Sequence, residues 1–352
     1  MFRPIILAVA LGAVLAAQPA AHAAQAPLAQ SPRTQHAELR RLFEEEWERG
    51  LVESPEAASF SGDRRFNDRW TDYSLAAIAR REAADRAALA RLHRIGRSSL
   101  SAADRLDYDT FEWQLARGIE RQKYREYLQP VGHQGGVQTA DGLAEVLPFA
   151  TVRDYEDWIA RLDGVPAIVE QSVTLMKEGL RAGNLPPRVL MQRVPGQIAA
   201  QVVDDPTKSP FYRPFLRFPD AIGATDRERL AARSQAVIRD RVVPAYRSMA
   251  TFFDREYLPK TRTSIAVTDL PDGKAYYDFL ARYYTTTDMG AVEIHALGLR
   301  EVSRIRARME ALKRETGFEG SLQEFFTFLR SDPRFFEKTP EALLTRYRSV
   351  AK

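Results

Sequence analysis

Hydrophobic residues recur every three or four positions along most of this chain, with polar residues between them, and this spacing is typical of amphipathic helices. The pattern is clearest around residues 294–312. One face of the predicted helix is apolar there: Ile294, Gly298, Val302, Ile305, Met309 and Leu312. Arginine and lysine residues fall off this face, as in a helix with one side on a core and the other in water. We therefore predict a core-packing helix.

A run of three threonines separates this helix from the one before it. Thr285, Thr286 and Thr287 are β-branched and have a low helix preference. Thr287 or Asp288 can cap the second helix, because a side-chain oxygen there accepts a hydrogen bond from a free backbone N–H. The sequence therefore predicts a break followed by a capped helix.

Helical patterns and helix-start signals cover most of the remaining chain. The start signals are Ser54-Pro55, Ser74, Ser101-Ala-Ala-Asp104, Thr151, Thr225-Asp-Arg-Glu228, Ser321-Leu-Gln-Glu324 and Thr339-Pro340. We expect a break at Gly164, a kink at Pro244 and one minor hairpin near Ser264. The prediction is an elongated all-α fold of roughly 10 to 14 helices.

Two segments interrupt the helical pattern. Residues 129–142 contain one proline and four glycines without any period, which indicates a turn-rich connection. Residues 204–223 carry four prolines among aromatic residues, and prolines at that density exclude a regular helix or a central strand. The aromatic residues indicate that this second segment packs on the rest of the protein as a lid or wall.

The first 23 residues have the pattern of a signal peptide. An apolar run from Ile5 to Ala17 follows the single charge at Arg3, and Ala21-His22-Ala23 matches a cleavage site. The run is too short to span a bilayer, so no membrane anchor is expected. We predict a signal peptide at 1–23, a disordered leader at 24–33 and a single helical domain at 34–352, in a periplasmic or secreted protein.

Charge and cysteine content exclude several classes of function. The chain has 51 basic and 47 acidic residues, well mixed along its length, which is not the footprint of a nucleic-acid-binding protein. It has no cysteine, which excludes disulfides, thiolate catalysis and cysteine-ligated zinc or iron–sulfur sites. The hydrophobic core alone must therefore stabilise the fold.

Three blocks near the apolar helix resemble a known family. They are residues 272–277 (Asp-Gly-Lys-Ala-Tyr-Tyr), 285–288 (Thr-Thr-Thr-Asp) and 294–305 (Ile-His-Ala-Leu-Gly-Leu-Arg-Glu-Val-Ser-Arg-Ile). The sequence resembles, from about Leu39 onward, the bacterial domain-of-unknown-function family numbered 885, whose members resemble secreted zinc metallopeptidases. The resemblance implies a mostly helical peptidase-like fold that acts on peptides and builds its zinc site on an H-E-x-x-H helix.

The sequence departs from that family in its metal-binding segment, because no H-E-x-x-H is present. No two of its histidines are four residues apart, so a two-histidine zinc helix cannot form. The histidines are His22, His36, His93, His133 and His295. We expect no catalytic residue, no metal site and no cofactor in this chain, and zinc only in the complete family fold. The fold is then incomplete at its C-terminus, and apolar surface at Leu343, Leu344 and residues 294–312 should be left without its packing partners.

Four residues are candidates for a substrate cleft. His295 flanks the apolar face. It holds a neighbouring carbonyl as a structural donor, contacts substrate near the zinc of a complete fold, or is simply exposed on the surface. Tyr276, Tyr277 and Tyr284 either donate phenolic hydrogen bonds into a cleft or pack in an aromatic core with their hydroxyls satisfied.

The leading hypothesis is therefore the N-terminal part of an exported zinc-metallopeptidase-like protein that acts on peptides, inactive in this chain alone. The alternative is a non-enzymatic helical binding or scaffold protein of the periplasm. Continuation of the reading frame past Lys352 into an H-E-x-x-H segment would favour the first.

Overall fold

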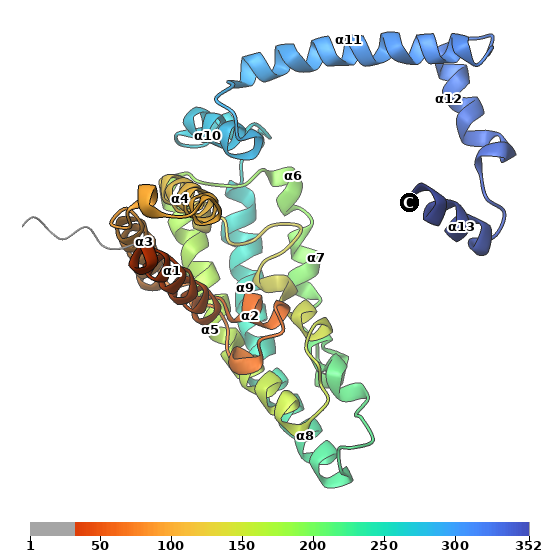
Figure 1. Ribbon diagram of the computed structural model, residues 1–352. Helices are drawn as coiled ribbons and strands as arrows, with labels where there is room; N and C mark the ends of the chain where they lie inside the picture. Colours follow the sequence, from red (N-terminus) through yellow and green to blue (C-terminus); the bar gives the residue numbers. More distant parts are fainter. Residues whose placement is uncertain (1–31, 352) are drawn as a thin grey trace, which may run out of the picture.

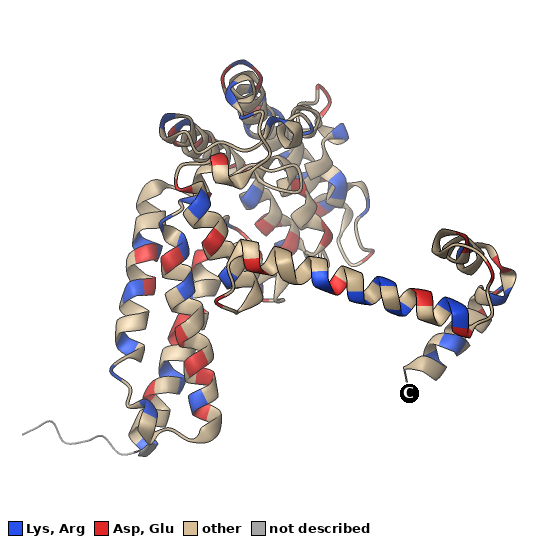
Figure 2. Ribbon diagram, turned by 90° about the horizontal axis from the view of Figure 1, so that it is seen from above, with Lys and Arg blue, Asp and Glu red and all other residues tan. Residues whose placement is uncertain are grey.

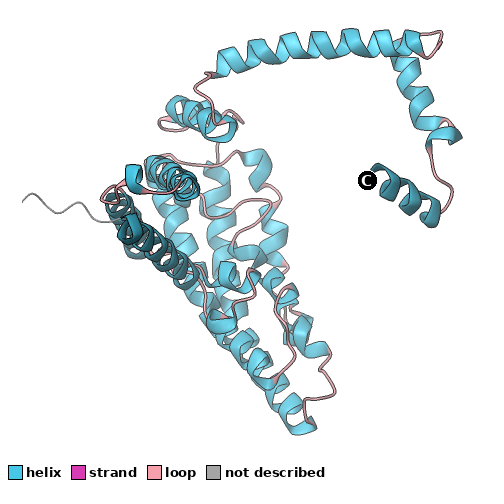
Figure 3. Cartoon of the chain, in the orientation of Figure 1, coloured by secondary structure: helices cyan, strands magenta, loops and turns pink. Residues whose placement is uncertain are grey.

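The computed structural model describes residues 32–351, and it builds them from helices joined by short loops, as Figure 3 shows. Within this range there is no strand, only two isolated β-bridges between Gly132 and Gly135 and between Pro187 and Arg262. The predicted all-α fold is confirmed. The α-helices are α1 (Pro32–Glu53), α2 (Pro55–Phe60), α3 (Leu75–Leu92), α4 (Ala102–Gln122), α5 (Val152–Ala182), α6 (Arg188–Met191), α7 (Val194–Ala199), α8 (Ala224–Val237), α9 (Val243–Phe252), α10 (Gly273–Thr285), α11 (Ala291–Glu315), α12 (Leu322–Ser331) and α13 (Pro340–Val350).

Short helical turns connect these elements. The 3₁₀ turns are η1 (Arg64–Phe66), η2 (Arg97–Ser99), η3 (Glu126–Leu128), η4 (Val137–Glu145), η5 (Pro206–Lys208), η6 (Pro210–Leu216), η9 (Leu258–Lys260), η10 (Val267–Asp269) and η11 (Pro333–Phe335). Two π-helical turns, η7 (Ile238–Val242) and η8 (Phe253–Tyr257), flank α9. The first of them ends at Val242, two residues before Pro244, the position of the predicted kink. The predicted signal peptide and most of the predicted leader lie outside the described residues.

The helices divide into two regions (Figure 1). Residues 32–262, which include α1 to α9, form a packed body. Residues 291–350, which include α11 to α13, form an arm. In it α11 extends away from the body, and the shorter helices α12 and α13 follow at its far end. The joint between them is α10, whose Phe279 is fully buried and whose Tyr283 stacks on Trp113 of α4 with ring centroids 5.5 Å apart.

The centre of the body is α5, a helix of 31 residues of which 13 are buried. It begins with a capping box in which Thr151 and Asp154 satisfy each other's backbone N–H groups. The break predicted at Gly164 is wrong, because α5 continues through this residue. Gly164 instead makes room for an aromatic ring, since a Cβ there would lie 3.1 Å from Cδ1 of Trp70.

A second apolar cluster joins α1, α3 and α4. Its buried residues are Leu39, Leu42, Leu92, Ile95, Leu100 and Tyr108. The helix start at Ser74 and the cap at Ser101 are confirmed, since the Ser74 hydroxyl accepts from the N–H of Ala77 and the Ser101 hydroxyl from that of Asp104. The cap predicted at Ser54 is wrong, because its side chain makes no capping hydrogen bond at the start of α2. These three helices form one side of the body in Figure 1.

The proline-rich segment 204–223 packs on α5, as its aromatic residues predict. Phe211, Tyr212 and Phe215 are buried, and the indole N–H of Trp158 donates to the carbonyl of Phe211 at 3.1 Å. The prolines confine the backbone to the short turns η5 and η6. The segment is part of the core.

The region from Ser264 to α11 differs from prediction in two ways. The hairpin near Ser264 does not form, because the guanidinium of Arg262 bonds the carbonyls of Ser264 (3.0 Å) and Ala266, and the chain turns into η10. The threonine break is confirmed, with Thr286 in the left-handed region at φ 54°. The predicted cap is wrong: α11 begins after Gly290, because the Thr287 hydroxyl pairs with that of Thr285 at 2.9 Å.

No residue of α11 is buried, so the apolar face of residues 294–312 is uncovered, as predicted for this chain. Val302, in the middle of the apolar face, is 64% exposed. The helix start predicted at Thr225 is shifted by one residue. Helix α8 begins at Ala224 after Gly223, and no side chain caps it. The caps of α12 by Ser321 and of α13 by Thr339 are confirmed.

Candidate ligand-binding cavity

A fully buried arginine organises one wall of the body. Arg161 of α5 donates to the carbonyls of Arg69 (2.9 Å) and Phe66 (3.0 Å) and to the Ser59 hydroxyl (2.9 Å). Its guanidinium also lies 5.3 Å from the centre of the Trp70 ring. Burial lowers the pKa of Arg161 to about 10, so it stays charged at neutral pH and ties the segment between α2 and α3 to α5.

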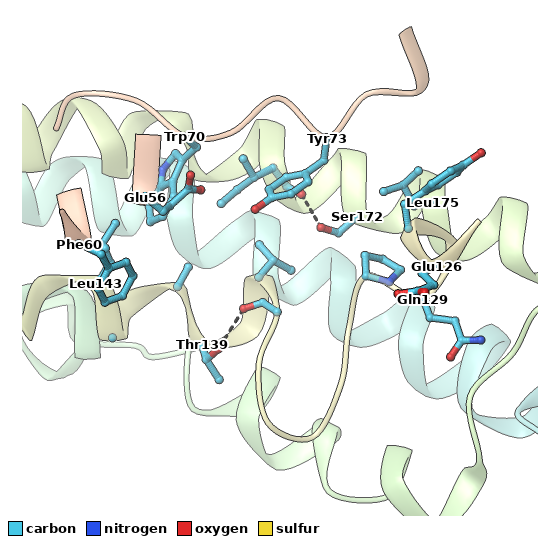
Figure 4. Close-up of a pocket in the computed structure, with 17 residues that line it drawn as sticks. Glu56, Phe60, Trp70, Tyr73, Glu126, Gln129, Thr139, Leu143, Ser172 and Leu175 are labelled. Atoms are coloured by element: carbon cyan, nitrogen blue, oxygen red, sulfur yellow. Dashed lines mark hydrogen bonds between the residues drawn. The ribbon is translucent and has the colours of Figure 1, made fainter. Parts of the chain in front are cut away.

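Beside this wall lies a cavity of about 470 Å³, shown in Figure 4. Three parts of the chain enclose it: α2 with the segment that follows, the connection after α4, and the middle of α5. The lining residues are Glu56, Phe60, Trp70, Tyr73, Glu126, Tyr127, Gln129, Pro130, Gly136, Val137, Thr139, Ala140, Gly142, Leu143, Ile168, Ser172 and Leu175. Most of the lining is apolar, with a few polar groups, as in typical small-ligand sites.

The side of the cavity on α5 is rigid and apolar. Ile168, Ser172 and Leu175 are buried and lie four and three positions apart, so they share one face of the helix. The Ser172 hydroxyl donates to the carbonyl of Ile168 at 2.8 Å. Across the cavity the Thr139 hydroxyl donates to the carbonyl of Gly136 at 3.0 Å, so both hydroxyl protons are used internally (Figure 4).

One end of the cavity carries the carboxylate of Glu56, in the first turn of α2. It accepts from the N–H of Thr71 at 3.2 Å and from the Thr71 hydroxyl at 2.5 Å. Within residues 32–351, no lysine, arginine or histidine forms an ion pair with it. Burial, and then the charge of Glu56, raise the pKa of the neighbouring Tyr73 phenol.

The other end carries Glu126, which is paired. Arg121 donates to both of its oxygens at 2.6 Å. Burial and a hydrogen bond to Glu126 raise the pKa of Tyr276. This tyrosine contacts the lining residue Glu126 but does not itself line the cavity. In Figure 4 the two glutamates lie far apart, one on each side of the view.

The four residues predicted for a cleft do not line this cavity. Tyr276 packs on Tyr124 with ring centroids 4.8 Å apart. Tyr277 is 46% exposed, and Tyr284 is 71% exposed and meets Tyr283 edge-on. His295 is exposed on α11. The structure brings only Tyr276 near the cavity, through Glu126, and the roles of all four stay predictions.

The histidines in the described part of the chain lie on separate elements. His36 meets Asp104 at 2.9 Å, His93 meets Glu112 at 2.7 Å, and His133 lies in the turn-rich connection. Among residues 32–351, no three histidine, cysteine, aspartate or glutamate side chains converge in a way that would hold a metal ion. The donor set of these residues therefore does not fit a zinc site.

Sequence patterns alone missed the cavity residues. Glu56, Trp70 and Tyr73 lie at or near a helix break, and their meeting with α5 depends on Arg161. One signal was present: Arg161 lies three residues after Trp158 on the buried face of a helix, where a charged residue needs partners.

Comparisons with known proteins give one family match and one similar solved structure. The family model described as "Bacterial protein of unknown function (DUF885)" matches residues 55–352. The fold is similar to the crystal structure of "the putative lipoprotein from Colwellia psychrerythraea", with a TM-score of 0.75 at 18% sequence identity. That match covers 91% of this chain and 58% of the other, so this chain spans little more than half of that structure. No curated protein matches it. Among the described residues, no helix has the length and apolar character needed to cross a membrane.

Proposed function

Since this chain belongs to the DUF885 family of bacterial proteins, we propose that it is the helical N-terminal part of an exported, zinc-metallopeptidase-like protein that acts on peptides. The observation that carries the proposal is the cavity on the body. Its volume of about 470 Å³ and largely apolar lining suit a peptide side chain with its neighbours. The role assigned to this chain is to bind and orient the peptide.

This chain's proposed role does not include the zinc centre, because no group of side chains among the described residues fits a metal ion. The zinc of the complete fold would polarise a scissile carbonyl and activate a water molecule. Its ligands would come from other residues. We therefore expect the 352-residue chain to bind peptides without cleaving them and without taking up stoichiometric zinc.

A non-enzymatic binding protein of the periplasm is the second candidate. The cavity favours it as well, because a largely apolar lining with a few polar groups suits the binding of a ligand without its cleavage. The reading frame past Lys352 separates the two candidates, since only the first requires an H-E-x-x-H segment there.

The experiment is to express the chain without residues 1–23, measure bound metal by elemental analysis, and assay binding and cleavage with a mixed peptide library. The proposal predicts peptide binding, no cleavage and no bound zinc. Near-stoichiometric zinc with chelator-sensitive hydrolysis would contradict the role assigned here, and a complete lack of peptide binding would remove its basis.

A further inference from the structure

The charged groups that line the cavity are all acidic. Its lining contains two carboxylates, those of Glu56 and Glu126, and contains no lysine, arginine or histidine. The rest of the surface is different, because acidic and basic residues alternate over most helices (Figure 2). A ligand that fills this cavity therefore meets negative charge without a cation supplied by the lining.

The two carboxylates are not equivalent. Glu126 is neutralised by two hydrogen bonds from Arg121, which lies outside the lining. Glu56 is held only by the N–H and hydroxyl of Thr71, which are neutral donors. The buried Arg161 is close enough for the charge of Glu56 to oppose the lowering of its pKa, but its hydrogen bonds go to backbone carbonyls and to Ser59. Glu56 thus remains the anionic group that a ligand can pair with.

The surroundings of Glu56 suit an ammonium group at the end of an alkyl chain. Trp70 and Tyr73 lie on the same side of the cavity as Glu56, and the faces of aromatic rings attract cations (Figure 4). Ile168 and Leu175 of α5 offer apolar surface for methylene groups. A neutral apolar side chain would fill the same space but leave the Glu56 carboxylate without a cation.

We propose that the cavity selects peptides that carry a lysine side chain, with the ammonium group at Glu56 and the alkyl stem against the α5 face. This inference rests on the proposed function, that the chain binds peptides. It adds the chemical class of the bound residue: a primary ammonium group on an apolar stem, within a peptide.

The test is calorimetric titration of the full chain with blocked tetrapeptides that differ at one position, which holds lysine, norleucine or glutamate. The lysine peptide should bind about tenfold more tightly than the norleucine peptide, and the glutamate peptide more weakly than both. Raising the salt concentration should weaken only the lysine complex appreciably. Free cadaverine is the comparison for an amine without a peptide.

Two variants locate the effect. Glu56→Gln keeps an oxygen that can accept a hydrogen bond from Thr71 but removes the charge. The roughly tenfold preference for the lysine peptide over the norleucine peptide should then disappear. Glu145→Gln, a neighbouring carboxylate that pairs with Arg213 outside the cavity, should leave the preference unchanged. Circular dichroism confirms that both variants are folded.

The outcomes separate this inference from the proposed function. If the peptides bind without regard to charge, or if Glu56→Gln keeps the preference for lysine, the inference is overturned while peptide binding stands. If cadaverine binds as tightly as the lysine peptide, the ligand is a free amine and the peptide part is overturned. If no peptide binds, the proposed function and the inference both fail.

Discussion

Two long helices of this protein have similar sequence patterns and opposite environments. The apolar face of α5 is at the centre of the body, with 13 buried residues among 31. The apolar face of α11 extends over several turns, yet none of its 25 residues is buried. Hydrophobic periodicity therefore predicts a helix and its apolar side, whereas burial depends on what other parts of the fold supply.

The charges differ in the same way. On α11, Arg304 and Glu301 form a solvent-exposed ion pair with their nitrogen and oxygen atoms 2.8 Å apart. On α5 the guanidinium of Arg161 is fully buried and organises a connection distant in sequence. Exposed pairs of the first kind contribute little to stability. Loss of a buried group of the second kind is costly, because it leaves buried carbonyls without their donor.

The largest effect is expected for a core truncation in α5. Trp158→Ala removes a fully buried ring and its hydrogen bond to Phe211, and should lower the free energy of unfolding by about 3–5 kcal/mol. Val302→Ala on α11 is the matched control and should change it by less than about 0.5 kcal/mol. Denaturant titrations measure both, and a comparable loss in the two variants would mean that α11 has a buried face in solution.

The next effect concerns the buried arginine. Arg161→Leu leaves the carbonyls of Phe66 and Arg69 without their donor and should cost about 3 kcal/mol. Arg304→Leu on α11 removes only an exposed ion pair and should leave the free energy of unfolding almost unchanged. Thermal unfolding compares the two. A stable Arg161→Leu variant would show that the wall of the cavity does not depend on this residue.

Glycine-to-alanine changes should have opposite signs in the two helices. In α5, a Cβ at Gly179 would lie 2.7 Å from the carbonyl oxygen of Leu128, so Gly179→Ala should destabilise by about 1–3 kcal/mol. In α11, Gly298 has open space around it, and Gly298→Ala should stabilise the helix by about 0.5–1 kcal/mol. The measurement is the melting temperature. Stabilisation by Gly179→Ala would contradict the close approach of the Leu128 carbonyl to α5.

The smallest effect is a pH dependence in the body. Hydrogen bonds from Arg40, then His36 and Ser101, lower the pKa of Asp104. A lowered folded-state pKa contributes stability above the unfolded-state pKa of about 4, and this is lost as the pH falls through the folded-state value. Asp104→Asn should therefore lower the melting temperature at pH 7, with a smaller difference at pH 3. The difference should be smaller for Glu301→Gln on α11, and an Asp104→Asn difference that does not depend on pH would contradict this.

Local sequence signals predicted a good part of this fold. Caps at Ser101, Ser321 and Thr339 depend on neighbouring residues and were placed correctly. The predicted cap at Thr287 is wrong, because the Thr287 hydroxyl forms a hydrogen bond with the Thr285 hydroxyl. The hairpin near Ser264 failed because a single arginine side chain bends the backbone there.

The cavity was not predictable from local signals. Glu56, Glu126 and Ser172 come from three segments that meet only when the body is folded. Arg161 ties only the segment between α2 and α3 to α5. No periodicity encodes such a meeting. The candidate residues on α10 and α11 came from motif resemblance, which points to a region of the chain without giving its distance from a cavity.

The central claim is that the body holds the main apolar core and the site, whereas the apolar face of α11 is uncovered within the described residues. Hydrogen–deuterium exchange of the dilute protein, followed peptide by peptide, tests it most directly. We predict that amides of α5 exchange only with global unfolding, whereas those of α11 exchange orders of magnitude faster. Equal protection of α11 and α5 would contradict it.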